Sequence, residues 1–223
     1  MLPEGLISIN GDNVQVLQIL FLTTMITLLP SLLVMMTSFA RYIISLSFLR
    51  TAMGTQQSPP NAVLVGMALV LTLFTMTPTL AAIKEDAYDP YVAGEITQEE
   101  FYQEAQVPLK DFMLRQTEIS SMALYCEMLD MDVPADMEEA ADLPLQVIMP
   151  AFVTSELKRA FEIGFLLYIP FMLIDIVVSS TLMSMGMIML PPAMISTPFK
   201  ILLFILLDGW HLLFSSLVQG INF

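Results

Sequence analysis

Long runs of uncharged, mostly apolar residues constrain this chain more than any other feature. The runs cover residues 14–39, 61–83, 163–174, 176–199 and 201–207. A helix needs about 20 mostly apolar residues to cross the hydrocarbon core of a membrane. The first two runs reach this length alone, and the region after residue 163 reaches it if Asp175 and Asp208 are accommodated. We therefore predict an all-α fold built from membrane-associated helical hairpins.

The charged residues are concentrated in one part of the chain. Only 13% of all residues are charged, against about 25% in ordinary soluble domains. Residues 84–150 hold 16 acidic and 3 basic residues and so carry nearly all of the net charge of −14. This acidity excludes nucleic acid as a partner, because phosphates are bound by lysine and arginine. The sequence thus predicts three regions: an N-terminal apolar helical region (1–83), a small acidic, water-exposed helical segment (84–150, the acidic segment) and C-terminal apolar helices (151–223).

The positive charges indicate how the chain is oriented in a membrane. They cluster at Arg41 and Arg50, and again at Lys158 and Arg159. Cytoplasmic loops carry an excess of lysine and arginine. The acidic segment is therefore predicted to lie on the non-cytoplasmic side.

Turn-forming residues and prolines predict where several helices begin and end. Residues 10–12 read Asn-Gly-Asp and predict a turn and a helix start. Pro30 predicts a kink or break in the helix that follows, because its ring removes a backbone donor. A polar connector is predicted at residues 54–60, ahead of a helix over 61–83. Residues 130–142 are acidic and predict a loop.

The acidic segment carries its own helix patterns. Thr97 and Glu100 fit a capping box, in which each side chain accepts a hydrogen bond from the other residue's backbone. From residue 109 to residue 129, apolar residues recur at helical spacing. Asp111 and Arg115 are spaced for an i,i+4 ion pair. A small packed helical subdomain is predicted here.

Residues 184–192 read Ser-Met-Gly-Met-Ile-Met-Leu-Pro-Pro and are called the methionine loop below. Regular helix should not continue through Pro191 and Pro192, because each ring removes a donor and disfavours helix in the preceding residue. The flexible, polarizable side chains of Met185, Met187 and Met189 suit a surface that must seal and then re-pack. Taken alone, the pattern favours the simpler interpretation, a methionine-rich loop between two apolar helices.

Charged residues embedded in apolar sequence allow two interpretations. A buried charge is costly in lipid, so each should face protein, water or another charge. One hypothesis is an ion-coupled transporter or proton channel that uses Asp175, Asp208 and His211. The other is a set of ion pairs between subunits, which we favour because the carboxylates are isolated and do not form a relay. The predicted assembly contacts are Arg41, Glu156, Lys158, Glu162, Asp175 and Lys200, with Lys158 and Glu162 spaced for an i,i+4 contact.

The sequence shows no pattern typical of catalysis. His211 is the only histidine, and neither a phosphate-binding glycine loop, a nucleophile elbow nor an HExxH pattern occurs. Cys126 is the only cysteine, which excludes an intramolecular disulfide and makes a packing role the simplest one. We expect no enzymatic activity, metal or cofactor. The first five residues lack the basic start and apolar core of a signal peptide, so we expect a chain without one or a processed form.

Several blocks of residues resemble the FliP family of flagellar biosynthetic proteins. They are SFARYII at 38–44, LRTAMGTQQSPPN at 49–61, TSELKRAFEIGF at 154–165, IPF at 169–171, ID at 174–175, MIMLPP at 187–192 and LDGW at 207–210. The resemblance extends over essentially the whole chain. Ala62, where a glutamine is expected, departs from the family pattern without affecting the fold that the resemblance implies.

The resemblance implies a subunit of the flagellar type III export gate in the bacterial inner membrane. In that family, several copies assemble with FliQ and FliR into a closed helical channel that lies partly on the periplasmic side. The channel receives unfolded flagellar proteins from an export machinery that includes FlhA and FlhB. The apolar helices are then buried against other subunits as well as against membrane lipid. Virulence-associated systems share this subunit type, and the flagellar assignment rests on the resemblance.

The resemblance also assigns roles within the methionine loop. Met187 and Met189 are similar to residues of a methionine gasket that constricts the closed pore, with Met185 beside them. Ile188 departs from the unbroken methionine triplet expected in relatives. Three residues, Gly186, Pro191 and Pro192, would set how far the loop moves.

Overall fold

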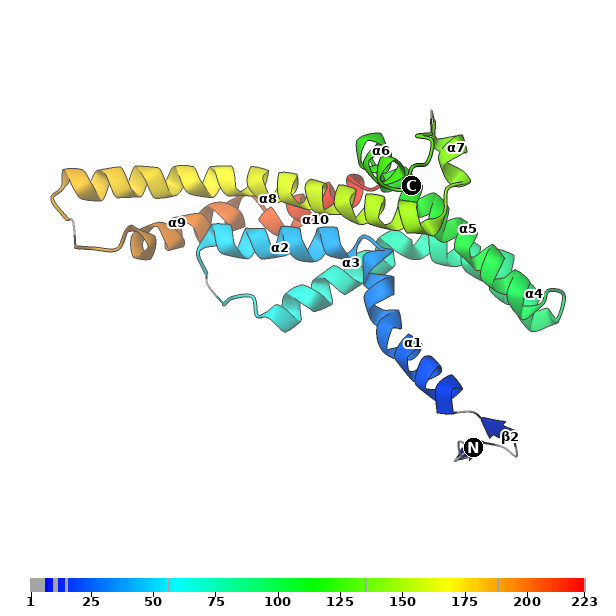
Figure 1. Ribbon diagram of the computed structural model, residues 1–223. Coiled ribbons are helices and arrows are strands. Elements are labelled where there is room, and N and C mark those ends of the chain that lie inside the picture. Colours follow the sequence, from blue (N-terminus) through cyan, green and yellow to red (C-terminus); the bar gives the residue numbers. More distant parts are fainter. Residues whose placement is uncertain are drawn as a thin grey trace.

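The computed structural model describes residues 7–9, 12–14, 16–55, 57–134, 136–187 and 189–222 (Figure 1). Apart from a short antiparallel pair of strands, β1 (Ile7–Ile9) and β2 (Asp12–Val14), the described elements are helices. The helices are α1 (Val16–Met35), α2 (Phe39–Met53), α3 (Asn61–Ile83), the π-helix η1 (Lys84–Tyr88), α4 (Asp89–Ala93), α5 (Gln98–Gln116), α6 (Ile119–Met128), α7 (Met137–Ala141), α8 (Leu145–Ser184), α9 (Pro192–Leu206) and α10 (Gly209–Gln219). The predicted all-α class is confirmed.

Among the described residues, two helical stretches are long and apolar enough to cross a membrane. One is the continuous helix Asn61–Ala93, formed by α3, η1 and α4, and the other is the 40-residue helix α8. A third span results if α9 and α10, which are bent by 66° relative to each other, are counted together. The prediction of a helical membrane protein is therefore confirmed.

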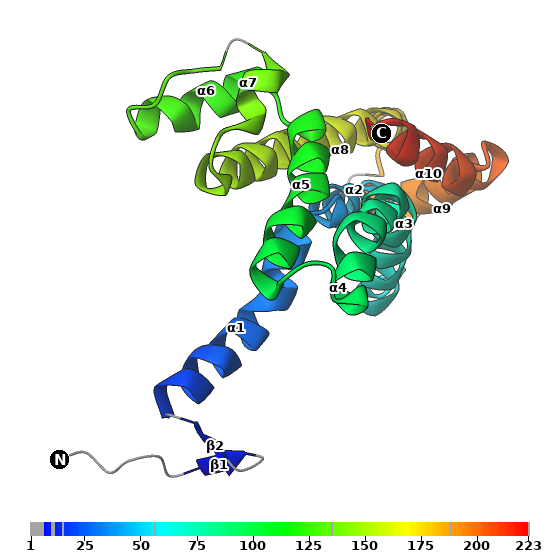
Figure 2. The ribbon, with the colours of Figure 1, turned by 90° about the vertical axis from the view of Figure 1, so that its right-hand side faces the viewer.

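The helices form an elongated body with different features at its two ends. Figure 1 shows α8 running along its length, with α2, α9 and α10 beside it. The methionine loop lies at one end, and α4 to α7 lie at the other. Viewed along this axis in Figure 2, α2 occupies a central position, and it contacts α8, α3 and α9. Helix α1 projects away from the body in both views.

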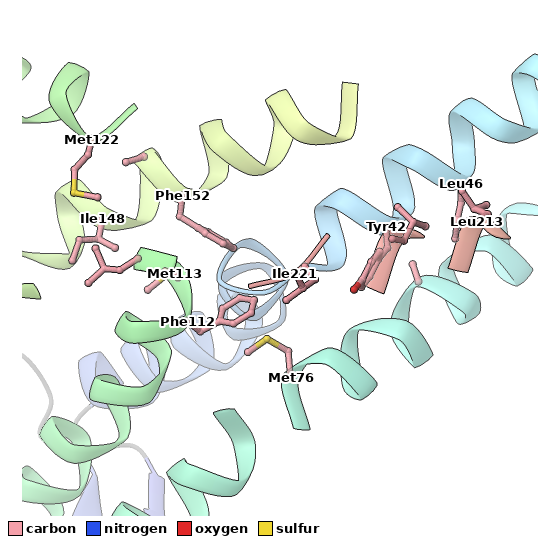
Figure 3. Close-up of a cluster of buried hydrophobic side chains, with 14 of the residues drawn as sticks. Tyr42, Leu46, Met76, Phe112, Met113, Met122, Ile148, Phe152, Leu213 and Ile221 are labelled. Atoms are coloured by element: carbon pink, nitrogen blue, oxygen red, sulfur yellow. The ribbon is translucent and has the colours of Figure 1, made fainter. Parts of the chain in front are cut away.

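The hydrophobic core is centred where α5 meets α2, α3 and the first half of α8. Figure 3 shows its members, which come from helices far apart in the sequence. They include Tyr42, Leu46, Met76, Phe112, Met113, Met122, Ile148, Phe152, Leu213 and Ile221, all of them buried. Burying one such side chain contributes about 1.5–3 kcal/mol. The core thus holds the acidic segment onto the apolar helices.

The first apolar run is divided at a different place from the predicted one. Pro30 lies inside α1, which continues to Met35, so the predicted break does not occur at the proline. The chain turns instead at residues 36–38, where the Thr37 hydroxyl donates to the Val34 carbonyl at 3.4 Å and so satisfies a backbone acceptor at the helix end. Residues 10 and 11 of the predicted turn lie outside the described residues. Asp12 belongs to a strand, and the helix begins only at Val16.

Two predictions for the acidic segment are confirmed and one is wrong in part. The capping box at Thr97 is present, and Arg115 pairs with Asp111 at 2.9 Å. The predicted loop at residues 130–142 contains the short helix α7. Asp136 explains this helix, because its carboxylate accepts a hydrogen bond from the Glu139 backbone N–H at 2.9 Å, as a capping residue does.

Cys126 lies in the core of the acidic segment, on α6. It is completely buried, and burial raises the pKa of its thiol. The predicted packing role is confirmed.

Candidate functional site

The methionine loop begins with a well-defined helix end. Gly186 has a φ of +75°, a left-handed conformation that favours glycine. Its N–H donates to the Met183 carbonyl at 3.0 Å, and the Met187 N–H donates to the Leu182 carbonyl at 2.9 Å. These two bonds form a Schellman motif, which ends α8. Gly186 therefore fixes where the long helix stops.

The loop ends as the sequence predicts, at its two prolines. Pro191 is extended, with a φ of −63° and a ψ of 119°, and Pro192 occupies the first turn of α9. Proline is favoured in this position because its missing N–H would have no partner there in any case. The predicted interruption of the helix is confirmed. Ile188, the residue that departs from the methionine triplet, lies outside the described residues.

The methionine side chains of this loop are unusually exposed. Met185 is 65% exposed, Met189 is 98% exposed, and Met187 between them is 42% exposed. Methionine is among the residue types most often buried. An apolar groove of about 600 Å³ between α8 and α9 leads to the loop, and Val177, Met185 and Phe199 contribute to its walls. An exposed apolar patch of this kind marks a contact surface.

Lys200 holds α9 against two neighbouring helices near the methionine loop. Its Nζ atom donates to Asp175 Oδ2 on α8 at 2.6 Å and to the Ala52 carbonyl on α2 at 3.0 Å. The Ala52 carbonyl lies in the last turn of α2, where a cation also interacts favourably with the helix dipole. The lysine side chain is buried, and the aspartate side chain is 40% exposed. Asp175 and Lys200, which the sequence predicted to pair between subunits, therefore pair with each other within one chain.

Arg41 and Glu156 form a buried ion pair between α2 and α8. Arg41 Nε donates to Glu156 Oε2 at 2.7 Å, and Nη2 donates to Glu156 Oε1. Both side chains are 1% exposed. Gln116, at the end of α5, accepts a further hydrogen bond from Arg41 Nη2 at 3.3 Å. Sequence reasoning missed Gln116, because an uncharged amide at a helix end carries no recognisable pattern.

Lys158 does not form the predicted pair with Glu162. Its Nζ atom donates to Glu118 Oε2 at 2.6 Å, because Lys158 and Ser155 lie on the same face of α8 and both reach the start of α6. This hydrogen bond lowers the pKa of the Glu118 carboxyl, which lies outside the spanning helices. Glu162 lies exposed one turn further along α8.

The residues around Asp208 form a sharp bend between α9 and α10. Asp208 has a φ of +48°. A Cβ on Gly209 would lie 2.3 Å from the Phe204 ring, so only glycine fits there. Trp210 then packs edge-on against Phe204, with the ring centroids 5.2 Å apart. The Asp-Gly-Trp sequence is thus explained by the bend, while Asp175 is paired with Lys200. Across the described residues, no group of three or more His, Cys, Asp or Glu side chains is arranged to hold a metal ion.

The fold and its two ends define a class of protein. It is a helical membrane protein whose longest apolar helix carries an exposed methionine loop at one end and is bound to an acidic helical segment at the other. Within this class, residues 22–217 match the model of the FliP family. The chain belongs to the FliP family.

Relatives from distant bacteria agree with this assignment. The chain is 48% identical over 214 residues to the flagellar biosynthetic protein FliP of Bacillus subtilis, which covers 96% of both chains. It is 47% identical over 212 residues to the protein of the same name from Aquifex aeolicus, covering 95% of this chain and 88% of the relative. It is 49% identical over 203 residues to the protein of the same name from Pectobacterium carotovorum, covering 91% of this chain and 78% of the relative. The resemblance predicted from the sequence is confirmed, and the chain belongs to a family of membrane-located flagellar biosynthetic proteins.

Proposed function

We propose that several copies of this chain form the channel of the flagellar type III export gate, which passes unfolded flagellar proteins across the bacterial inner membrane. The observation that supports this most directly is the exposed methionine loop at the end of the α8–α9 hairpin. In a single chain these side chains cover nothing. Copies arranged around an axis would bring one loop each to the centre.

The chemistry of the loop suits a seal that must open for many substrates. Thioether side chains exclude water and ions when packed together, and they adapt to polypeptides of different sequence. The Schellman motif at Gly186 and the first turn of α9 at Pro192 hold the two ends of the loop. Movement is then limited to the short stretch that carries Met187 and Met189.

The exposed apolar faces of the helices are the surfaces on which neighbours would pack. Phe165, Leu173 and Val177 on α8 and Val70 and Phe74 on α3 are all largely exposed. Further copies of this chain and homologues of FliQ and FliR are the proposed neighbours, with lipid on the remaining surface. FlhA and FlhB would deliver substrates from the cytoplasmic side. The acidic segment would lie on the periplasmic side, in agreement with its charge.

The buried ion pairs would act on assembly through the shape of the subunit. Arg41–Glu156 and Lys200–Asp175 are formed within one chain, and each fixes helices that carry exposed apolar faces. Loss of Arg41, Glu156 or Asp175 leaves a buried charge without its partner. We propose that these pairs set the helix positions that neighbouring copies require. Glu162, exposed on α8, is the proposed direct contact with another copy.

The proposed seal is tested by the combined change of Met185, Met187 and Met189 to alanine. Smaller side chains should leave the ring open, so cells with this variant should leak ions while the complex still assembles on native gels. Leucine at the same three positions keeps the volume and should keep the seal. Met128→Ala, which removes an exposed methionine from α6, is the matched control. Unchanged conductance in the triple alanine variant would rule out the seal.

A further inference from the structure

A buried polar cluster joins four separate parts of the chain. Arg41 lies at its centre, with its Nη1 atom donating to the Gly220 carbonyl at 2.7 Å and its other donors directed to Glu156 and Gln116. Each of these three side chains is at least 99% buried. Gly220 follows α10, whereas Arg41 is on α2, Gln116 on α5 and Glu156 on α8. The cluster, called the polar hub below, consists of Arg41, Gln116, Glu156 and the segment Gly220–Asn222, and Arg159 at its edge donates from Nη1 to Gln116 Oε1 at 3.3 Å.

The segment after α10 is held in the hub by its backbone and by one apolar side chain. Gln116 Nε2 donates to the Asn222 carbonyl at 2.6 Å, and the Asn222 N–H donates back to Gln116 Oε1 at 3.3 Å. Asn222 Nδ2 also donates to the Arg115 carbonyl at 3.1 Å. Ile221 between them is buried and belongs to the same core cluster as Phe112 (Figure 3). The side-chain amide of Gln116 therefore pairs with this backbone as a neighbouring strand would.

The buried ion pair depends on this segment for its full set of hydrogen bonds. A buried salt bridge is favourable only when further hydrogen bonds satisfy the remaining donors. The Gly220 carbonyl accepts from Arg41 Nη1, whereas Glu156 accepts from Arg41 Nε and Nη2. If the segment left, that N–H would be buried without this acceptor, which is costly. Docking of the segment and formation of the ion pair are therefore coupled.

The segment also fixes one end of a longer arm. Helices α9 and α10 form this arm, which starts at the methionine loop and bends at Asp208. Lys200 holds the arm near the loop through Asp175 and Ala52. The hub holds its other end. The arm thus has one polar anchor on each side of the bend.

We propose that Gly220–Asn222 is a latch that fixes the α9–α10 arm by completing the hydrogen bonding of the buried Arg41–Glu156 pair and of Gln116. The latch connects the end of α5, in the acidic segment, to the arm that carries one end of the methionine loop. The latch itself does not depend on the proposed export function. Its effect on the methionine loop rests on that function.

Hydrogen exchange of the purified full-length protein tests the latch directly. Gln116→Leu removes both bonds to Asn222, together with the acceptor of Arg41 Nη2 and Arg159 Nη1, and keeps the volume of the side chain. We expect the amides of residues 217–222 to exchange about tenfold faster or more, because local opening no longer breaks these bonds. Gln106→Leu, on an exposed part of the same helix, should leave them unchanged. Equal exchange in the two variants would overturn the latch.

A milder variant keeps the test interpretable if Gln116→Leu impairs folding. Asn222→Ala removes only the donor to the Arg115 carbonyl and should give a smaller increase, about two- to threefold. Gly66→Ala on α3, where a Cβ would meet nothing within 4 Å, is its control and should leave the exchange of residues 217–222 unchanged. An effect of Gly66→Ala as large as that of Asn222→Ala would argue against the latch.

The arm and the loop have separate readouts. Trp210, the only tryptophan, lies on α10 between Phe204 and Phe214, so Gln116→Leu should increase its quenching by acrylamide. An ion leak in the same variant would support coupling to the methionine loop. If exchange increases without a leak, the coupling is wrong and the latch stands. If the triple methionine variant does not leak, the proposed seal is wrong, and the exchange result still decides the latch.

Discussion

The two ends of α8 have similar hydropathy but very different surroundings. In its first third, Ile148, Phe152 and Glu156 are buried by α2, α5 and α6 of the same chain. In its last third, Ile176, Val177 and Met183 are largely exposed, and the helix ends at the methionine loop. The first part is thus completed within the subunit, whereas the second part needs lipid or another subunit. Hydropathy indicates that both parts of α8 avoid water, but it does not indicate whether the same chain, another subunit or lipid covers them.

The largest loss of stability is expected for the buried ion pair of Arg41 with Glu156, which lies in the first third of α8. Arg41→Ala would leave Glu156 buried without its partner, and breaking a buried pair costs about 3–5 kcal/mol. The subunit should unfold at a much lower denaturant concentration in detergent, as followed by circular dichroism. Arg115→Ala removes the exposed pair with Asp111 and should cost about 1 kcal/mol or less. Similar losses of unfolding free energy in the two variants would contradict the distinction between a buried and an exposed ion pair.

Two isoleucines on α8 give a matched test of the packing difference. Ile148 is fully buried and Ile176 is 54% exposed. Ile148→Ala should cost about 3 kcal/mol, because it opens a cavity in the core. Ile176→Ala should change the stability of the single subunit by about 0.5 kcal/mol or less, while lowering the yield of the oligomer on native gels. If Ile176→Ala instead destabilised the subunit and left the oligomer intact, its face would belong to the fold of one chain.

The helical fold and the interruption at the methionine loop could be predicted, because apolar runs and prolines act locally. Gly186 and the capping box at Thr97 also follow from local rules. The partners of the buried charges could not, since Arg41 and Glu156 are 115 residues apart and no local pattern relates them. Lys158 shows the same limit: its spacing indicated Glu162, and tertiary packing brought Glu118 closer. The role of Gly220–Asn222 depends on backbone groups, which every sequence has.

An intermediate loss of stability is expected at the bend between α9 and α10. Gly209→Ala would place a Cβ against the Phe204 ring, and such overpacking typically costs about 1–3 kcal/mol. Thermal unfolding followed by Trp210 fluorescence would measure the loss. Gly66→Ala in α3, where a Cβ would meet nothing within 4 Å, should be neutral or stabilising by up to about 1 kcal/mol. Adding Phe204→Leu should partly rescue Gly209→Ala, and a failure to do so would mean that the strain lies elsewhere.

The smallest effect is expected for the partly exposed pair of Lys158 with Glu118, and its pH dependence identifies it. The hydrogen bond from Lys158 lowers the pKa of Glu118 in the folded protein. A carboxyl with a lowered folded pKa stabilises the protein above its unfolded value, about 4.3, and this contribution is lost as the pH falls through the folded pKa. Glu118→Gln should therefore be slightly less stable than the unmodified chain at pH 7 and equally stable once the pH is well below 4.3. Denaturant titrations of both chains from pH 7 to pH 3 would show this convergence. A difference that persisted at low pH would mean that Glu118 contributes through packing at the start of α6 and not through its charge.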